Sequence, residues 1–182
     1  MPTLPTILFS AFQSGADPQR QSWARFREQV NTRSLAVVPA AAPSIADRSS
    51  RARVAVASTG QDESGIWRLL APNNRELGRS SFLYGTFRAA RSHVLQLRDA
   101  DGLVATTVPG PLAESYGWFI SLKGVPVMTC TRWYGNPASS AEAGRAALAA
   151  FALAIVGEAP LRATSSGRRT TRAPRNGAAA AW

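Results

Sequence analysis

The chain has 182 residues, of which 45% are hydrophobic, and it carries a formal net charge of +10. This length and this share of hydrophobic residues are enough for one hydrophobic core of ordinary size. The single cysteine, Cys130, and single histidine, His93, exclude a disulfide framework and a four-ligand Cys/His metal site. The sequence contains neither an apolar run of about eighteen residues nor a convincing leader, so we expect a cytoplasmic protein without a membrane span.

Residues 1–52 are predicted to form an N-terminal extension that is mostly disordered. The first fifteen residues mix Pro, Thr and Ser with scattered apolar residues and follow neither a helical nor an alternating period. Asp17 is a candidate N-cap, and Pro18 suits the first helical position, so we expect a short helix over 17–31. Its apolar stripe is Trp23, Phe26 and Val30. The helix either docks on the main domain or binds a partner, and we favour docking.

The apolar sequence that follows contains a spacing that recurs. Trp67 and Phe82 are fifteen residues apart, and Trp118 and Trp133 repeat that spacing 51 residues later. We interpret this pattern as two copies of one structural unit.

Residues 65–97 make up the first copy. Alternation over 66–71 predicts a strand, and 72–74, with sequence Pro-Asn-Asn, predicts a turn. A second strand is expected over 76–84, followed by a helix with Thr86 as its N-cap. The buried stripe of this helix is predicted to be Phe87, Ala90, Val94 and Leu97.

Residues 117–156 make up the second copy, in which Lys123-Gly124 is a candidate tight turn between two strands. Three additional residues, 136–138, are expected before its helix. Ser139 and Glu142 have the spacing of a capping box. An offset of 54 residues would then place the helical stripe on Ala141, Gly144, Leu148 and Phe151.

Together the copies are predicted to form one α+β domain over 53–158. The domain includes a short alternating segment at 53–58 and a β-branched strand at 103–108. One copy has too few strands and helices to bury both faces of a sheet. We therefore expect two tandem ββ(β)α repeats in one mainly antiparallel sheet with two helices packed on it.

The repeated pattern resembles the YegP-like family of small, often duplicated domains of unknown function. The resemblance rests on an aromatic residue that opens a strand, a polar turn, a Ser/Thr-rich return strand that ends in aromatic residues, and an Ala-rich helix. It implies a mainly antiparallel sheet with strand exchange between units, in which Leu103–Val108 would be the linking or exchanged strand. The family has no established activity, so the resemblance implies a fold and no reaction.

No reactive constellation is recognisable in the sequence. His93 lies one residue off the stripe of the first helix and is interpreted as a boundary residue, and Cys130 is interpreted as an unreactive thiol. Glycine-rich phosphate loops are absent from the sequence. We therefore expect a protein that is not an enzyme and that needs no cofactor or metal.

Residues 159–182 are predicted to form a disordered basic tail with a charge of +5. Such a tail either binds nucleic acid or an anionic membrane, or keeps the domain soluble, and we weight these two roles equally. Arginine enrichment is also typical of a GC-rich coding sequence. The arginines concerned are Arg162, Arg168, Arg169, Arg172 and Arg175.

A second candidate surface consists of aromatic residues at equivalent strand ends, with Arg79 and Arg132 nearby. Such a set either stacks on nucleic-acid bases or packs in the core, and core packing is the more common outcome. The aromatic residues are Phe82, Tyr84, Trp133 and Tyr134.

The sequence thus predicts an uncharacterised, non-enzymatic binding or interaction domain of the YegP-like type. Its partner would be another protein or a second copy of the chain at an exposed sheet edge, with no membrane involved. The alternative is weak, sequence-nonspecific binding of nucleic acid through the basic tail.

Overall fold

The computed structural model describes residues 4–12, 14–37 and 64–162. Seven strands form one sheet in the order β4-β5-β6-β3-β2-β1-β7, and only the β1–β7 pairing is parallel. The predicted α+β class with a mainly antiparallel sheet is therefore confirmed. The elements are β1 (Thr6–Phe12), α1 (Pro18–Val37), β2 (Ser64–Leu70), β3 (Glu76–Ser80), α3 (Phe87–Arg98), β4 (Leu103–Pro109), β5 (Tyr116–Leu122), β6 (Val125–Thr129), α4 (Pro137–Leu153) and β7 (Ile155–Arg162).

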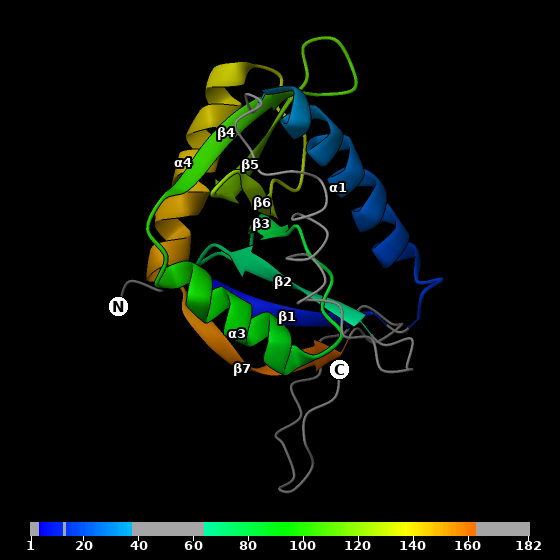
Figure 1. Ribbon diagram of the computed structural model, residues 1–182, viewed down its shortest axis with the longest axis vertical. Helices are drawn as coiled ribbons and strands as arrows, with labels where there is room; N and C mark the ends of the chain where they lie inside the picture. Colours follow the sequence, from blue (N-terminus) through cyan, green and yellow to red (C-terminus); the bar gives the residue numbers. More distant parts are fainter. Residues whose placement is uncertain (1–3, 13, 38–63, 163–182) are drawn as a thin grey trace, which may run out of the picture.

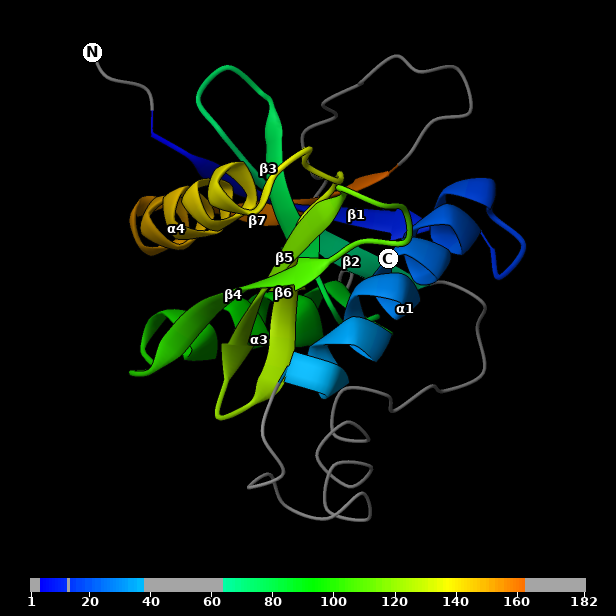
Figure 2. The same ribbon diagram turned by 90° about the horizontal axis from the view of Figure 1, so that it is seen from above.

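The described helices cover both faces of the sheet (Figures 1 and 2). On β2, Trp67 stacks against Phe151 of α4, with ring centroids 5.6 Å apart. The preceding residue, Ile66, packs with Trp23 of α1. Because neighbouring residues on a strand point to opposite faces, α4 and α1 lie on opposite sides of the sheet. The α3 helix packs beside β1, β2 and β7 on the α4 side, where Phe87 meets Phe9.

The N-terminal segment is ordered structure, so the expectation of a mostly disordered extension over 1–52 is wrong for the part that the structure describes. Residues 6–12 form β1, which lies between β2 and β7. Its alternation is real but short: Ile7, Phe9 and Ala11 are buried on one face. Seven residues between a Pro and a Gly are too few for this alternation to be recognised in the sequence. The domain therefore begins well before residue 53.

Docking of the helix that begins at Pro18 is confirmed. The indole Nε1 of Trp23 donates to the backbone oxygen of Ser80 at 3.1 Å, and the ring of Phe26 lies 4.9 Å from that of Trp133. The side chain of Asp17 accepts from a backbone N–H in the first turn, as expected of an N-cap. The helix runs to Val37, six residues beyond the predicted end.

The two halves of the sheet have matching architecture. Strands β1, β2 and β3 with α3 correspond to strands β4, β5 and β6 with α4, and the halves meet at the antiparallel β3–β6 pair. Both β2–β3 and β5–β6 contain one register shift, at equivalent positions. In both halves a buried Trp donates to a Tyr hydroxyl, Trp67 to Tyr84 at 3.2 Å and Trp118 to Tyr134 at 3.5 Å. Duplication as the origin of this match stays a prediction.

The prediction of three additional residues, 136–138, before the helix α4 is wrong, because the helix already begins there. Asn136 is the N-cap and Pro137 opens the helix, so Ser139 with Glu142 is not its capping box. Asn at the N-cap followed by Pro is the stronger start signal. Trp118 follows its counterpart Trp67 by 51 residues, and Tyr134 follows its counterpart Tyr84 by 50 residues. The first three buried residues of α4 follow buried residues of α3 by the same 50 residues and not by the predicted 54. The buried residues of α4 are Ser140, Gly144, Ala147 and Phe151, whereas Ala141 and Leu148 are half-buried.

The C-terminal boundary also differs from the prediction. The helix ends at Leu153, and residues 155–162 form the edge strand β7, so the chain is regular structure beyond residue 159. Because the sequence analysis did not identify β1 as a strand, its parallel pairing with β7 could not be predicted. The rest of the predicted tail, like the predicted strand at 53–58, lies outside the described residues.

Candidate anion-binding pocket

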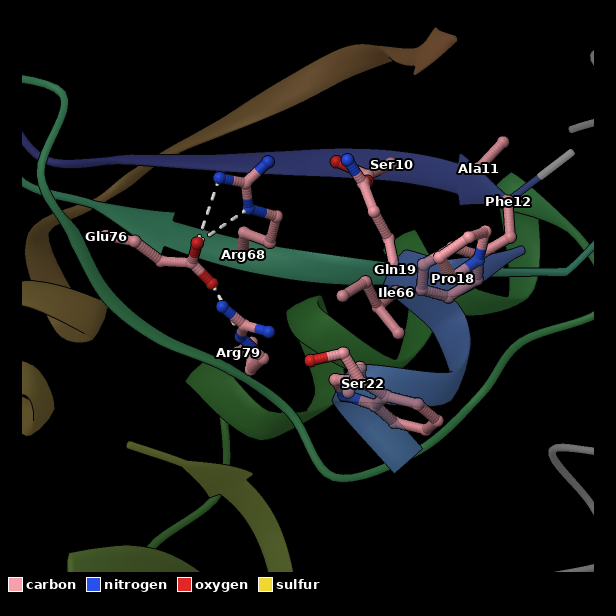
Figure 3. A pocket seen from close by; sticks show the side chains of 11 residues that line it. Ser10, Ala11, Phe12, Pro18, Gln19, Ser22, Ile66, Arg68, Glu76 and Arg79 are labelled. Carbon is pink, nitrogen blue, oxygen red and sulfur yellow. Dashed lines mark hydrogen bonds and ion pairs between the residues drawn. The ribbon is translucent and has the colours of Figure 1, made fainter. Parts of the chain in front are cut away.

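Two arginines on the α1 side of the sheet share one carboxylate. Arg68 on β2 and Arg79 on β3 are direct cross-strand neighbours. Glu76 accepts the Nε–H of Arg68 at 3.0 Å and the Nε–H of Arg79 at 2.7 Å, one on each carboxylate oxygen (Figure 3). Two like charges directly opposite each other repel, and the carboxylate between them offsets this repulsion. The cluster keeps a net charge of +1.

The cluster contributes little to stability, because its side chains are not deeply buried. The exposed fractions are 35% for Arg68, 24% for Arg79 and 16% for Glu76. Ion pairs this close to water contribute between zero and about 1 kcal/mol. Its consequence is geometric: Glu76 holds two guanidinium groups in fixed positions at the surface.

The three charged residues form one end of an open pocket of about 420 Å³. The other end is made by the last residues of β1 and the first turns of α1, as Figure 3 shows. The pocket therefore has a charged end and a mixed end with apolar and hydroxyl or amide groups. The residues at the mixed end are Ser10, Ala11, Phe12, Pro18, Gln19, Ser22, Trp23 and Ile66.

A small buried cluster supports the mixed end. Phe12, Trp23 and Ile66 are each at most 5% exposed and pack together where β1, α1 and β2 meet. Because Trp23 is also tied to the backbone of β3, the first turns of α1 cannot shift without breaking that hydrogen bond. The pocket is thus largely pre-formed in the folded chain.

The arginines retain hydrogen-bonding capacity. Arg79 uses only its Nε–H within the part of the chain that the structure describes, which leaves both of its terminal amino groups for a ligand. Arg68 uses Nε and one terminal nitrogen on Glu76 and keeps the other. A planar guanidinium fork matches carboxylate and phosphate oxygens, so this end of the pocket suits an anion.

The structure brings one of the predicted site residues into this pocket and separates the others. Arg79 lines the pocket, whereas exposed Arg132 lies over the ring of Tyr134, 5.1 Å from its centroid. Arg162 ends β7. Arg168, Arg169, Arg172 and Arg175 lie outside the described residues.

Sequence reasoning missed Arg68 and Glu76. The alternation of β2 already placed Arg68 opposite the Trp67 face, and Glu76 precedes Arg79 by three residues. A search for charged residues facing each other across the predicted hairpin would have found the cluster.

The four strand-end aromatic residues pack against the protein, which supports the core-packing alternative. Tyr84 is 1% exposed. The ring of Phe82 meets His93 edge-on at 5.5 Å, and that of Trp133 meets Phe26 at 4.9 Å. These side chains do not form one open platform for bases.

His93 belongs to a hydrogen-bonded chain beneath α3. The indole N–H of Trp67 can only donate, so the Tyr84 oxygen accepts from it, and the same oxygen lies 2.6 Å from His93 Nδ1 in a second hydrogen bond. When neutral His93 carries its proton on Nε2, Tyr84 donates to Nδ1. Burial lowers the pKa of His93 and raises that of Tyr84, so both groups stay neutral near pH 7.

Stability is therefore expected to fall as the pH drops through the range in which unfolded histidine binds a proton, near 6.5. The folded chain resists protonation, so the unfolded state binds more protons there, and acid favours unfolding. Urea midpoints measured between pH 7.5 and 5.5 should decrease in the wild type. In His93→Gln, whose amide oxygen can still accept from Tyr84, this decrease should be smaller. An equal decrease in both proteins would contradict the assignment.

Cys130 is buried, and its sulfur accepts the backbone N–H of Trp118 at 3.3 Å. Burial raises the pKa of the thiol to about 11, so the reactive thiolate is scarce at neutral pH. Within the described ranges, no three His, Cys, Asp or Glu side chains gather where they could hold a metal ion. No helix in those ranges is long and apolar enough to cross a membrane.

Comparison with known proteins identifies no relative. No family model, no curated protein and no solved structure matches this chain.

Proposed function

We propose that this chain is a non-enzymatic binding domain that holds an anionic group in the pocket between α1 and the β2–β3 hairpin. The observation that carries the proposal is the pair Arg68 and Arg79, fixed by Glu76 and still able to donate to a ligand. A partly solvated guanidinium pair in a pre-formed hollow suits binding. His93 and Cys130 are both engaged in internal hydrogen bonds, which supports a role without covalent chemistry.

The proposal retains the resemblance to the YegP-like family. Its support is the matching order of the two halves and the position of β4. This strand follows α3 of the first half along the chain and pairs along its full length with β5, as the edge strand of the second half. This is the role expected of a linking strand. The resemblance adds no ligand, so the ligand chemistry is argued from the pocket alone.

The two ends of the pocket together favour an organic anion over an inorganic one. A phosphate or carboxylate group would pair with Arg79 and Arg68, while an attached apolar body would lie toward Pro18 and Phe12. Phenyl phosphate has both parts and is a suitable probe. We expect it to bind more tightly than inorganic phosphate, whereas phenol, which lacks the charge, should bind weakly.

The test is calorimetric titration of the full chain with these three probes. Arg79→Gln should weaken phenyl phosphate binding roughly tenfold or more, because a hydrogen bond to a charged group is lost. Arg75→Gln is the matched control: Arg75 is exposed in the same hairpin, does not line the pocket, and carries the same charge. Equal weakening in both variants would indicate general charge attraction and contradict the proposal.

A second candidate function is sequence-nonspecific binding of nucleic acid by the basic C-terminal segment. It is favoured by the position of β7, which ends at Arg162 opposite Ala11, so that the arginine-rich sequence leaves from a structured edge. Replacing Arg168, Arg169, Arg172 and Arg175 with Gln in the full chain should abolish such binding and leave phenyl phosphate binding unchanged.

A further inference from the structure

The edge strand β4 directs a row of backbone hydrogen-bonding groups away from the sheet. On β5, Tyr116 exchanges two backbone hydrogen bonds with Tyr134, and the oxygen of Trp118 accepts from Cys130, so even-numbered residues of β5 bond toward β6. Neighbouring residues of a strand bond to opposite sides, so the odd-numbered residues of β5 bond toward β4. The register of β4 against β5 then determines which residues of β4 bond outward. They are Leu103, Ala105 and Thr107.

This edge has none of the features that protect an edge strand from pairing. All seven residues of β4 pair with β5 in one unbroken register, none is charged, and the one proline, Pro109, is the last. The opposite edge strand, β7, contains Glu158, Pro160 and a register shift against β1. Charge, proline and irregular pairing are the usual protection of a sheet edge. Figure 2 shows β4 with no described helix or strand in front of it, so its edge is open to another strand.

The matching halves of the sheet indicate what this edge accepts. Strand β4 is the counterpart of β1, and the outer side of β1 is paired with β7. Among the described residues, the equivalent position beside β4 holds no strand. The chain thus already adds one strand to this edge in its first half, and the same kind of partner fits the second half.

We propose that β4 pairs antiparallel with β4 of a second copy of this chain, about a two-fold axis at Ala105. Ala105 then faces Ala105 of the second copy, and Leu103 faces Thr107 of the second copy, so all outward N–H and C=O groups are used. The two adjacent registers lose bonds. One brings Thr107 opposite the turn at Gly102, where a φ of 88° ends the extended backbone, and the other brings Leu103 opposite Pro109, which has no N–H.

The side chains and helices beside the axis fit a second copy. Val104 is 56% exposed and would lie opposite Thr106 of the second copy, a β-branched pair that covers it. On the other face, α4 packs on both β4 and β5. Because adjacent strands are about 4.8 Å apart, two α4 helices midway over these strands would lie about 10 Å apart, the spacing of packed helices. The alanine-rich sequence of α4 permits this approach.

Such a dimer is closed. The two-fold axis uses the β4 edge of both copies and leaves β7, the protected strand, at each end of the joined sheet. Pairing therefore stops at two copies. Since β4 does not line the anion-binding pocket, the dimer does not depend on the proposed anion binding.

The first test is sedimentation equilibrium of the full chain over a range of concentrations, in which the wild type should approach twice the mass of one chain. Val104→Lys should raise the dimer Kd about tenfold or more, because lysine on an edge disfavours strand pairing. Ile155→Lys is the matched control, since Ile155 is a β-branched residue, 55% exposed, on the opposite edge strand. A wild type that stays monomeric at about 100 µM, or a dimer that Ile155→Lys disrupts as strongly, overturns the proposal.

The second test uses disulfide formation to measure the register. Residues opposite each other in a hydrogen-bonded pair have Cα atoms about 5.5 Å apart, a distance that a disulfide spans, so Ala105→Cys should form a covalent dimer on oxidation. Thr107→Cys lies about 14 Å along the strand from Thr107→Cys of the second copy and should not. The native Cys130 is buried in both proteins. Cross-linking through Thr107→Cys, or through neither cysteine, contradicts an axis at Ala105. Circular dichroism of each variant confirms that the fold is retained.

Discussion

Trp67→Ala is expected to lower the free energy of unfolding by about 3–5 kcal/mol, the usual range for loss of a fully buried tryptophan. The side chain is 0% exposed, stacks on Phe151 of α4 and donates to Tyr84 beneath α3. One residue thus joins both helices of that face to the sheet, and alanine would leave a cavity between them. Urea unfolding followed by far-UV circular dichroism measures the loss without relying on tryptophan fluorescence.

Trp67→Phe separates packing from hydrogen bonding. It retains an aromatic ring against Phe151 and removes the N–H donor to Tyr84, so its cost should be clearly smaller than that of the alanine variant. If the two substitutions cost the same, the ring contact is not what stabilises this face. A loss below about 1 kcal/mol in Trp67→Ala would place the residue outside the core.

The second large effect is expected at Trp23, which attaches α1 to the sheet. Trp23→Ala should cost about 3–5 kcal/mol, because the side chain is 3% exposed, packs with Phe12 and Ile66, and donates to Ser80. The substitution also removes one wall of the anion-binding pocket. Phenyl phosphate binding should therefore weaken even under conditions in which the protein remains folded.

Arg25→Ala is the control for Trp23→Ala. Arg25 is exposed on the same helix, so its loss should change neither stability nor phenyl phosphate binding appreciably. If Trp23→Ala leaves binding intact while α1 loses helicity, the helix is not part of the binding site, and the charged end of the pocket acts alone.

Much of the local structure could be predicted because short-range rules decide it. Thr86 caps α3 as expected, and the predicted stripe of Phe87, Ala90, Val94 and Leu97 matches the residues that α3 buries. Lys123 and Gly124 have φ values of 50° and 78°, the left-handed backbone that a two-residue hairpin turn requires. These signals act within four residues of each other, so the sequence alone is sufficient.

The sequence by itself therefore determined the α+β class, the periodic elements and their turns. The tertiary structure decided which strands pair, that residues 6–12 and 155–162 complete the sheet, and that Arg68 and Arg79 meet at Glu76. The physical reason is distance along the chain. The partners of β1 lie about 50 to 150 residues away, and the burial that they provide outweighs the weak strand preference of its own seven residues. A binding pocket made from β1, α1 and a hairpin exists only after those long-range contacts form.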